Sequence, residues 1–262
     1  MTDRIPPLLR MYIWLLMAVT SLPIVVVIGA SFNEGMAIMF PPKGLTLHWY
    51  REALGNAEVL RTAWNSLVVA IGCTLTAIVI GVPAAIALVR HVKKRRELLQ
   101  SILLSPLTVP SIVVGMAFLA FFTQTGIGLN LPSLIIAHTV VTLPYIIRSV
   151  ASIYLSVEST VEEAAASLGG SPWQVFWHVT APLIRPGIVA GAIFAFIMSF
   201  DNVSVSIFIT KNDTLTLPIY MMSYLVYNFD PSIAAISVIR TALTALLLLF
   251  LEKAYGAARM LV

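Results

Sequence analysis

Charged residues are scarce in this chain of 262 residues. Only 11% are Asp, Glu, Lys or Arg, whereas 59% are hydrophobic, and the mean hydropathy is +0.93. A soluble domain of this length cannot hide so much apolar surface in one core. The composition therefore indicates an integral membrane protein that uses lipid as part of its solvent.

The chain also lacks the common signatures of catalysis. Its single cysteine, Cys73, lies inside an apolar stretch, so no intrachain disulfide is possible, and we expect no metal site there. The phosphate-binding loop G-x-x-x-x-G-K-[ST], the zinc motif H-E-x-x-H and the nucleophile elbow G-x-S-x-G are all missing from the sequence. We therefore predict that the chain is not an enzyme, needs no cofactor and does not itself hydrolyse ATP through such a loop.

Six apolar runs are each long enough to cross a bilayer as a helix. They lie at about residues 11–31, 64–89, 101–122, 131–153, 187–209 and 232–251. These runs predict an all-α, polytopic membrane protein with six transmembrane helices, in which residues 1–262 form one transmembrane domain. Pro83 in the second run, and Pro106 and Pro110 in the third, predict kinked helices.

Basic residues are unevenly shared between the segments that join these runs. With the N-terminus inside, eleven fall on inner segments and four on outer ones. The inner set is Arg4, Arg10, Arg90, Lys93, Lys94, Arg95, Arg96, Arg148, Arg185, Lys253 and Arg259, and the outer set is Lys43, Arg51, Arg61 and Lys211. This bias predicts that both termini are cytoplasmic. It also accounts for the net charge of +4 without a nucleic-acid partner, and we expect none.

The segment at residues 156–186 is the longest polar interruption between the apolar runs, and the same bias places it in the cytoplasm. Ser159 with Glu162 predicts a capping box that starts a helix, and Gly169 predicts its end in a left-handed conformation. A second capping box at Ser171 predicts a second helix start.

A helical wheel divides the first of these helices into two faces. The apolar face consists of Val157, Val161, Ala164, Ala165 and Leu168. We expect this face to rest on the protein's own helices. Glu158, Glu162 and Glu163 flank Ala166 on the opposite face, which leaves a shallow, acidic surface for a partner.

The same segment resembles the EAA loop of permease subunits in binding-protein-dependent ABC importers. That loop consists of Glu-Ala-Ala, three residues, Gly, nine residues and then Ile-x-Leu-Pro. Glu163, Ala164, Ala165, Gly169 and Pro182 are in register with it, with Val179 in place of Ile and Ala181 in place of Leu. The resemblance implies a type I importer permease of MetI-like architecture, in which residues 156–186 couple the permease to a separate ATPase. The coupling residues it implies are Glu162, Glu163, Ala164, Ala165, Ala166, Gly169 and Pro182.

The resemblance also implies a set of partners and a location. We expect two copies of an ATP-binding subunit per complex, a second permease that is homologous or identical, and a periplasmic or lipid-anchored solute-binding protein. Membrane lipid surrounds the chain. The expected location is the bacterial cytoplasmic (inner) membrane.

Several polar residues interrupt the apolar runs and are candidates for lining a translocation path. They are His138, Asp201, Asn202, Ser204 and Arg240. Ionisable groups are costly at membrane depth and mark functional sites by default. Two alternatives stay open at this point: Asp201 and Arg240 neutralise each other, or Asp201 contacts a passing cation. For His138, a hydrogen-bonded place inside the helix bundle is the alternative to a role in the path.

The function remains open between two classes. In the first, the chain is the permease of an ATP-driven importer. In the second, it is a proton-coupled secondary carrier in which Asp201, Arg240 and His138 form a relay. Six spans are few for a self-contained carrier, which favours the importer.

Three patches narrow the substrate within the importer class. They are Ala137-His138-Thr139, Ser199-Phe200-Asp201-Asn202-Val203 and Thr216-Leu217-Pro218. They are similar to the spermidine/putrescine permease subgroup, which implies a polyamine as the solute. An amino acid derivative, an opine or a phosphonate is the alternative.

Overall fold

The computed structural model describes residues 6–92, 94–228 and 230–255, and most of the described residues are helical. A single antiparallel bridge, between Asn33 and Leu45, lies outside the helices, and no strand is formed by the described residues. The prediction of an all-α protein is confirmed. The basic residues Arg4, Lys93 and Arg259 and both chain termini lie outside the described residues.

Five helical stretches among the described residues are long and apolar enough to cross a membrane. They are α1 (Pro7–Ser31), α3 (Ala57–Ile86) with the π-helical turn η1 (Ala87–His91), α6 (Leu131–Ser156), the stretch Pro172–Phe200, and α12 (Ser232–Tyr255) over Ser232–Leu249. A bent pair of helices brings the number to six if the pair is one span. The sequence therefore predicted the apolar helices well, apart from two differences in their bounds.

The first difference is a break in the third predicted span, 101–122. Helix α4 (Arg96–Leu104) continues into a 3-10 turn, η2 (Ser105–Leu107), and α5 (Ser111–Gln124) then leaves at 90°. Pro110, the N-cap residue of α5, disfavours helical backbone in the residue before it and has no N–H to donate. The predicted kink is therefore a sharp bend between two helices.

The second difference concerns the fifth predicted span, 187–209. The observed helix starts earlier, with α8 (Pro172–Val175) and the π-helical turn η3 (Phe176–Thr180), and α9 (Ala181–Phe200) ends at Phe200. A short helix, α10 (Ser206–Ile209), follows after a break. The apolar run at 187–209 therefore continues past the end of α9 and includes α10.

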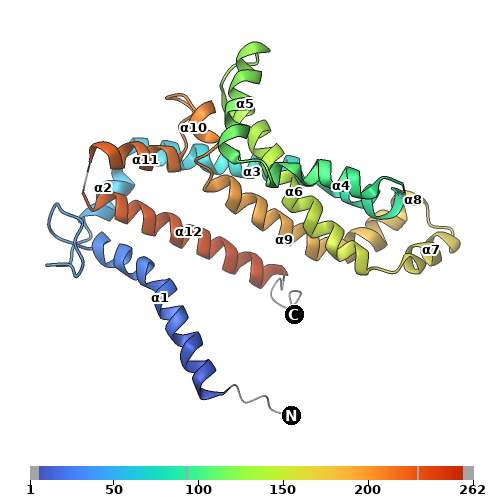
Figure 1. Cartoon of the computed structure of the whole chain (residues 1–262), viewed down its shortest axis with the longest axis horizontal. Helices are drawn as coiled ribbons and strands as arrows, with labels where there is room; N and C mark the ends of the chain where they lie inside the picture. Colours follow the sequence, from blue (N-terminus) through green and yellow to red (C-terminus); the bar gives the residue numbers. More distant parts are fainter. Residues whose placement is uncertain (1–5, 93, 229, 256–262) are drawn as a thin grey trace. The chain divides into compact units, whose positions relative to one another are not determined.

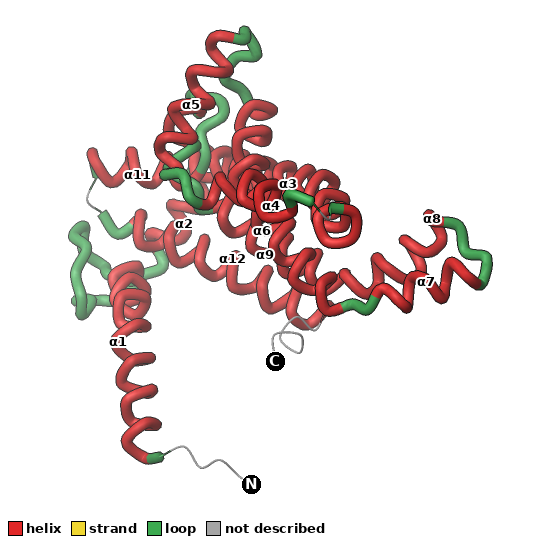
Figure 2. Tube along the Cα trace, turned by 45° about the vertical axis from the view of Figure 1, so that its right-hand side comes forward, coloured by secondary structure: helices red, strands yellow, loops and turns green. Residues whose placement is uncertain are grey.

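The chain divides into two compact units, one of residues 61–220 with 246 onward, and one of the remainder up to residue 245. In the first unit α6 and α9 pack side by side (Figures 1 and 2). A Cβ on Gly187 would meet the Ser149 carbonyl oxygen at 2.8 Å, and one on Gly191 would meet the Ile146 Cα at 2.9 Å. Gly187 and Gly191, four residues apart on α9, thus let the two helices approach closely.

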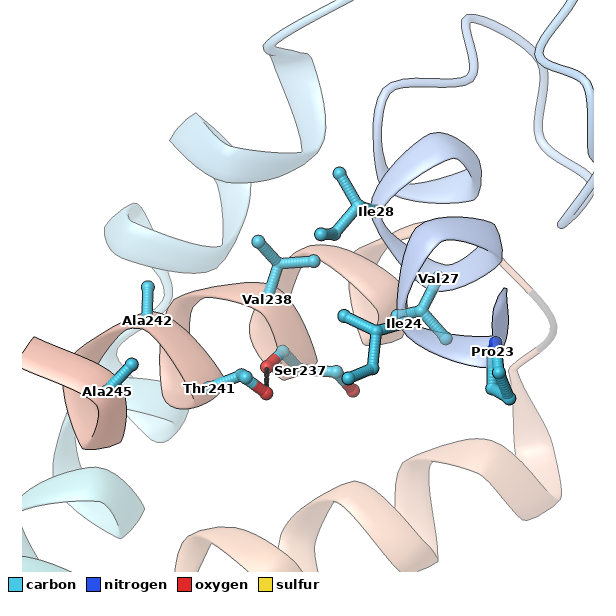
Figure 3. Close-up of a pocket in the computed structure, with 9 residues that line it drawn as sticks. All are labelled: Pro23, Ile24, Val27, Ile28, Ser237, Val238, Thr241, Ala242 and Ala245. Carbon is cyan, nitrogen blue, oxygen red and sulfur yellow. Dashed lines mark hydrogen bonds between the residues drawn. The ribbon is translucent and has the colours of Figure 1, made fainter. Parts of the chain in front are cut away.

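In the other unit α1 and the first part of α12 border an apolar groove of about 350 Å³ (Figure 3). Ile24, Val27 and Val238 contribute much of its lining. The Ser237 and Thr241 hydroxyls donate to carbonyl oxygens of their own helix, those of Ile233 and Ser237, so the groove offers little free polarity. In the same unit α2 (His48–Gly55) and α11 (Leu217–Tyr227) contribute shorter helices, the latter extending into the first unit.

Candidate functional site

A helical hairpin connects α6 to α9 and contains the segment that resembles the EAA loop. Its first helix is α7 (Ser159–Ser167), and Figure 2 shows α7 and α8 forming the two arms. Gly169 has φ +89°, and its N–H donates to the Ala166 carbonyl oxygen at 3.0 Å. This left-handed turn is the predicted end of the first helix.

The second arm begins with the predicted capping box. The Ser171 N–H donates to Gln174 Oε1 at 2.9 Å, and the Gln174 N–H donates to Ser171 Oγ at 3.3 Å. Pro172 occupies the first helical turn, where its missing N–H costs no hydrogen bond. The start of the second arm is therefore fixed by local sequence, as predicted.

The predicted capping box at the start of the first arm is wrong. The N-cap residue is Glu158, whose side chain makes no cap hydrogen bond, and Ser159 already lies inside the helix. Glu162 does not reach back to the helix start, because its carboxylate is held by partners from other elements.

Three side chains converge on the Glu162 carboxylate. The Tyr154 hydroxyl donates to Oε1 at 2.7 Å and the Thr180 hydroxyl donates to the same oxygen at 2.5 Å. The Arg90 Nε donates to Oε2 at 3.2 Å. These partners come from the end of α6, from η3 and from η1, so one carboxylate joins four elements.

Arg90 makes two further contacts beside this carboxylate. Its Nη2 donates to the Val157 carbonyl oxygen, at the C-cap of α6, at 2.7 Å. Its guanidinium carbon lies 4.4 Å from the centroid of the Tyr154 ring. The side chains of Arg90 and Glu162 are 23% and 17% exposed, so water screens their attraction less than on an open surface.

These contacts set the protonation of Glu162. Burial alone would raise the pKa of its carboxyl, but the hydrogen bonds from Thr180 and Tyr154 and the charge of Arg90 outweigh burial, and the pKa is lowered. Glu162 is therefore ionised at neutral pH and accepts hydrogen bonds through both oxygens.

The remaining loop residues show which face of α7 is free. Glu163, Ala164, Ala166, Gly169 and Pro182 are exposed, whereas Glu162 and Ala165 are half-buried. The predicted inward apolar face is wrong, because Leu168 is 90% exposed and Val161 is 46% exposed. Helix α7 is rotated so that Glu162 faces the protein and Glu163 faces away from it.

His138 lies inside the first unit. It is 1% exposed, with Nδ1 at 2.8 Å from Ser199 Oγ at the end of α9 and Nε2 at 3.0 Å from Ser206 Oγ at the start of α10. Both ring nitrogens are engaged, so the histidine bridges the break between the two helices. It has the predicted alternative role of a hydrogen-bonded residue within the bundle.

Three of the other polar candidates, Asp201, Asn202 and Ser204, lie at that break. Asp201 is the C-cap residue of α9 and is exposed, and the Asn202 side-chain oxygen accepts the Val205 N–H at 2.9 Å. Ser204 is half-buried in the same break. Arg240 lies on α12 in the other compact unit. Asp201 was predicted to lie within a span, but it follows the last turn of α9.

Three residues of the Glu162 cluster had no individual signal in the sequence. Arg90 was one of a basic run, Tyr154 ended an apolar run, and Thr180 lay between two positions of the EAA pattern. Their common partner emerges only once α6, α7, η1 and η3 are placed in space.

Comparison with known proteins identifies the family. Residues 77–257 match the model of the binding-protein-dependent transport system inner membrane component. The chain belongs to this family. It is thus a transporter permease component of an inner membrane and not an enzyme, and the alternative of a proton-coupled secondary carrier is set aside.

Curated relatives cover most of the chain. The spermidine/putrescine transport system permease protein PotC of Haemophilus influenzae is 28% identical over 236 residues, which cover 89% of this chain and 90% of PotC. The putrescine transport system permease protein PotI of Escherichia coli is 26% identical, with 82% and 79% covered. The putative 2-aminoethylphosphonate transport system permease protein PhnV of Salmonella paratyphi A is 29% identical, with 88% of each covered.

Solved structures agree on the fold. A chain of a bacterial ABC transporter involved in the import of alginate is similar with a TM-score of 0.71 at 14% identity, covering 95% of each chain. The MetNI methionine ABC transporter has a similar chain with a TM-score of 0.60 at 21% identity, covering 77% of this chain and 93% of that one. The MetI-like permease architecture predicted from the EAA resemblance is confirmed.

Proposed function

We propose that this protein is the permease subunit of an ATP-driven importer for a polyamine, coupled to a separate ATPase through α7. The observation that carries the proposal is the orientation of two adjacent acids: Glu162 is bound inside the protein, whereas Glu163 is exposed on the outer face of α7. A short helix held this rigidly, outside the spans and with a free acidic face, is suited to seat in a partner.

The proposed complex contains two copies of the ATPase, a second homologous or identical permease, and a periplasmic or lipid-anchored solute-binding protein. Structural neighbours support these kinds of partner, since one is an alginate ABC transporter in complex with its substrate-bound periplasmic protein. ATP-driven closure of the ATPases would move α7 and switch the path between outward and inward access. ATP hydrolysis is assigned to the partner.

The polyamine assignment rests on the PotC and PotI relatives. Because PhnV has nearly the same identity to this chain and nearly the same coverage as PotC, 2-aminoethylphosphonate is tested beside the polyamines. The test is uptake of radiolabelled putrescine, spermidine and 2-aminoethylphosphonate into proteoliposomes that contain the complete complex and its binding protein. Uptake of either polyamine supports the proposal, and uptake of the phosphonate alone overturns the polyamine assignment.

The role of Glu163 is tested in the same proteoliposomes. Glu163→Arg reverses the charge on the exposed face and should abolish uptake while the variant still inserts in the membrane. Glu97→Gln, on the exposed first turn of α4, removes a carboxylate elsewhere and serves as control. Full solute-stimulated ATP hydrolysis and uptake by Glu163→Arg would refute the coupling role.

We further propose that Asp201, Asn202 and Ser204, together with Arg240, contribute to the translocation path. Asp201 stands where the α9 C-terminus carries partial negative charge, which suits a cation. Asp201→Asn, Arg240→Gln and the double variant separate two roles. Normal assembly without uptake in Asp201→Asn and in the double variant supports cation contact, whereas recovery of uptake in the double variant shows a charge pair instead.

The proposed orientation places the hairpin and both termini in the cytoplasm. Cysteine labelling from outside intact cells should reach Asn212→Cys and miss Gly170→Cys. The reverse pattern would end the ATPase-coupling proposal, because no cytoplasmic ATPase could reach α7.

A further inference from the structure

The Glu162 cluster lies where α7 meets the ends of the spans, and its members are far apart in the chain. Arg90 precedes Glu162 by 72 residues and Thr180 follows it by 18. Through its side chain Glu162 joins α7 directly to η1 and to η3. The contacts of this carboxylate therefore determine whether α7 moves together with η1 and η3 or independently of them.

Two partners of Glu162, Arg90 and Thr180, lie in segments of unusual backbone conformation. Arg90 lies in the π-helical turn η1 and Thr180 in the π-helical turn η3. A π turn holds an additional residue and so redirects the side chains next to it by about 100° compared with an uninterrupted α-helix. Such turns are less favourable than α-helix and are common at functional sites. Here, both of them carry a residue that binds Glu162.

Arg90 also secures the connection between α6 and α7. Its bond to the Val157 carbonyl oxygen satisfies the C-cap of α6, and its bond to Glu162 reaches one turn into α7. The short connection at residues 157–158 is thus bracketed by one guanidinium. Tyr154 holds the same carboxylate from the last turn of α6, so the angle between α6 and α7 is fixed at two points.

We infer that Glu162, Arg90, Tyr154 and Thr180 form a rigid junction, here called the joint. The joint makes α7 move as one body with the ends of α3, α6 and α9. Glu162 is then a positioning residue, and Glu163 beside it is the residue left to the partner. This division rests on the proposed coupling role of α7. Without the joint, a push on α7 would bend the hairpin at residues 157–158 and would not reach the spans.

The joint is tested first in the permease alone. Spin labels at Ile136→Cys on α6 and Ser167→Cys on α7, in a Cys73→Ala background, report the α6–α7 geometry by pulsed electron paramagnetic resonance. Wild type should give a narrow distance distribution. Glu162→Ala and Arg90→Ala should each broaden it, and Glu97→Gln should not.

The double variant Arg90→Ala/Glu162→Ala gives a second criterion. Because both changes break one network, it should broaden the distribution no more than either single variant. Glu162→Gln keeps an acceptor for Tyr154 or Thr180 and should recover part of the narrow distribution. Unchanged distributions in both alanine variants would overturn the joint.

The consequence for transport is measured as solute taken up per ATP hydrolysed, in the complete complex. Glu162→Ala and Arg90→Ala should lower this ratio about tenfold, a size within the usual range for the coupling between two sites. Glu97→Gln should leave it unchanged. A broadened distribution with an unchanged ratio would overturn the positioning role. If wild type transports none of the three solutes, the proposed substrate fails, while the spectroscopic result still decides the joint.

Discussion

The guanidinium of Arg90 lies over the ring of Tyr154, with 4.4 Å between its central carbon and the ring centroid. The same tyrosine turns its hydroxyl to Glu162. Its ring thus attracts the cation while its hydroxyl binds the carboxylate, and both ends of the ion pair are held by one side chain. This arrangement makes the response of the hairpin to pH and to substitution specific enough to measure.

Acid should loosen the hairpin through Glu162. The pKa of its carboxyl is lower in the folded than in the unfolded protein, so its stabilisation is fully present above the ordinary glutamate pKa and is lost as the pH falls through the folded value. Thermal unfolding of the detergent-solubilised permease below about pH 4 should therefore show a steeper loss of Tm in wild type than in Glu162→Gln. Equal slopes would contradict this assignment.

The effect of replacing Gly169 should depend on how readily the new residue adopts a left-handed backbone conformation. Its φ of +89° disfavours residues with a Cβ, and Gly169→Val should cost at least about 1 kcal/mol and redirect the second arm. Gly169→Asn should be milder, since Asn enters this region more readily. Uptake per ATP and thermal stability check both variants. Gly55→Ala is the control, because nothing lies within 4 Å of a Cβ there.

The contact between α6 and α9 should be intolerant of added volume at Gly187. A Cβ there would lie 2.8 Å from the Ser149 carbonyl oxygen and 3.0 Å from the Val150 Cα, so Gly187→Ala should destabilise the permease by about 1–3 kcal/mol. Ala190 on the same helix lines a groove of about 510 Å³. Ala190→Val should be tolerated. Thermal unfolding compares the two, and an equal effect would show that the contact has room to adjust.

Removal of the His138 bridge should destabilise the break between α9 and α10. His138→Ala leaves the Ser199 and Ser206 hydroxyls buried without this partner, at a cost of about 1–3 kcal/mol for each unsatisfied group. A triple variant that also replaces both serines with alanine should lose less stability per group removed. Limited proteolysis at the break and thermal unfolding report the effect. Wild-type behaviour of His138→Ala would show that packing alone holds the break.

Local chemistry was sufficient to predict the second arm of the hairpin. Gly169 and the box at Ser171 act through neighbours within three residues, so the printed order of residues contains the whole interaction. The first arm was mispredicted because two sets of hydrogen bonds compete for the Glu162 carboxylate. A capping box with Ser159 is the local set, and the contacts to Arg90, Tyr154 and Thr180 form in its place.

The apolar composition was sufficient to predict where the long helices lie but not where they end. Residues 187–209 are apolar on both sides of Asp201, so hydropathy alone joins α9 and α10 into one run. Pro110 predicted a bend but not its size, because a proline removes a backbone hydrogen bond without fixing the angle between the helices, which is 90° here. The wheel failed for α7 because Arg90, Tyr154 and Thr180 bind the Glu162 carboxylate, and with Glu162 facing the protein Val161 and Leu168 are left exposed.

The hydrogen bonds of His138 to Ser199 and Ser206 bear on whether this histidine can carry a proton across the membrane. A neutral imidazole has one N–H, so in the bridge one serine accepts from the ring and the other donates to it, and the ring is buried. A proton carrier needs a group that picks up and releases its proton at two different surfaces. His138 is held at both ring nitrogens between α9 and α10, so its place in the fold is that of a fixed link between these helices and not of a group that carries a proton between two surfaces.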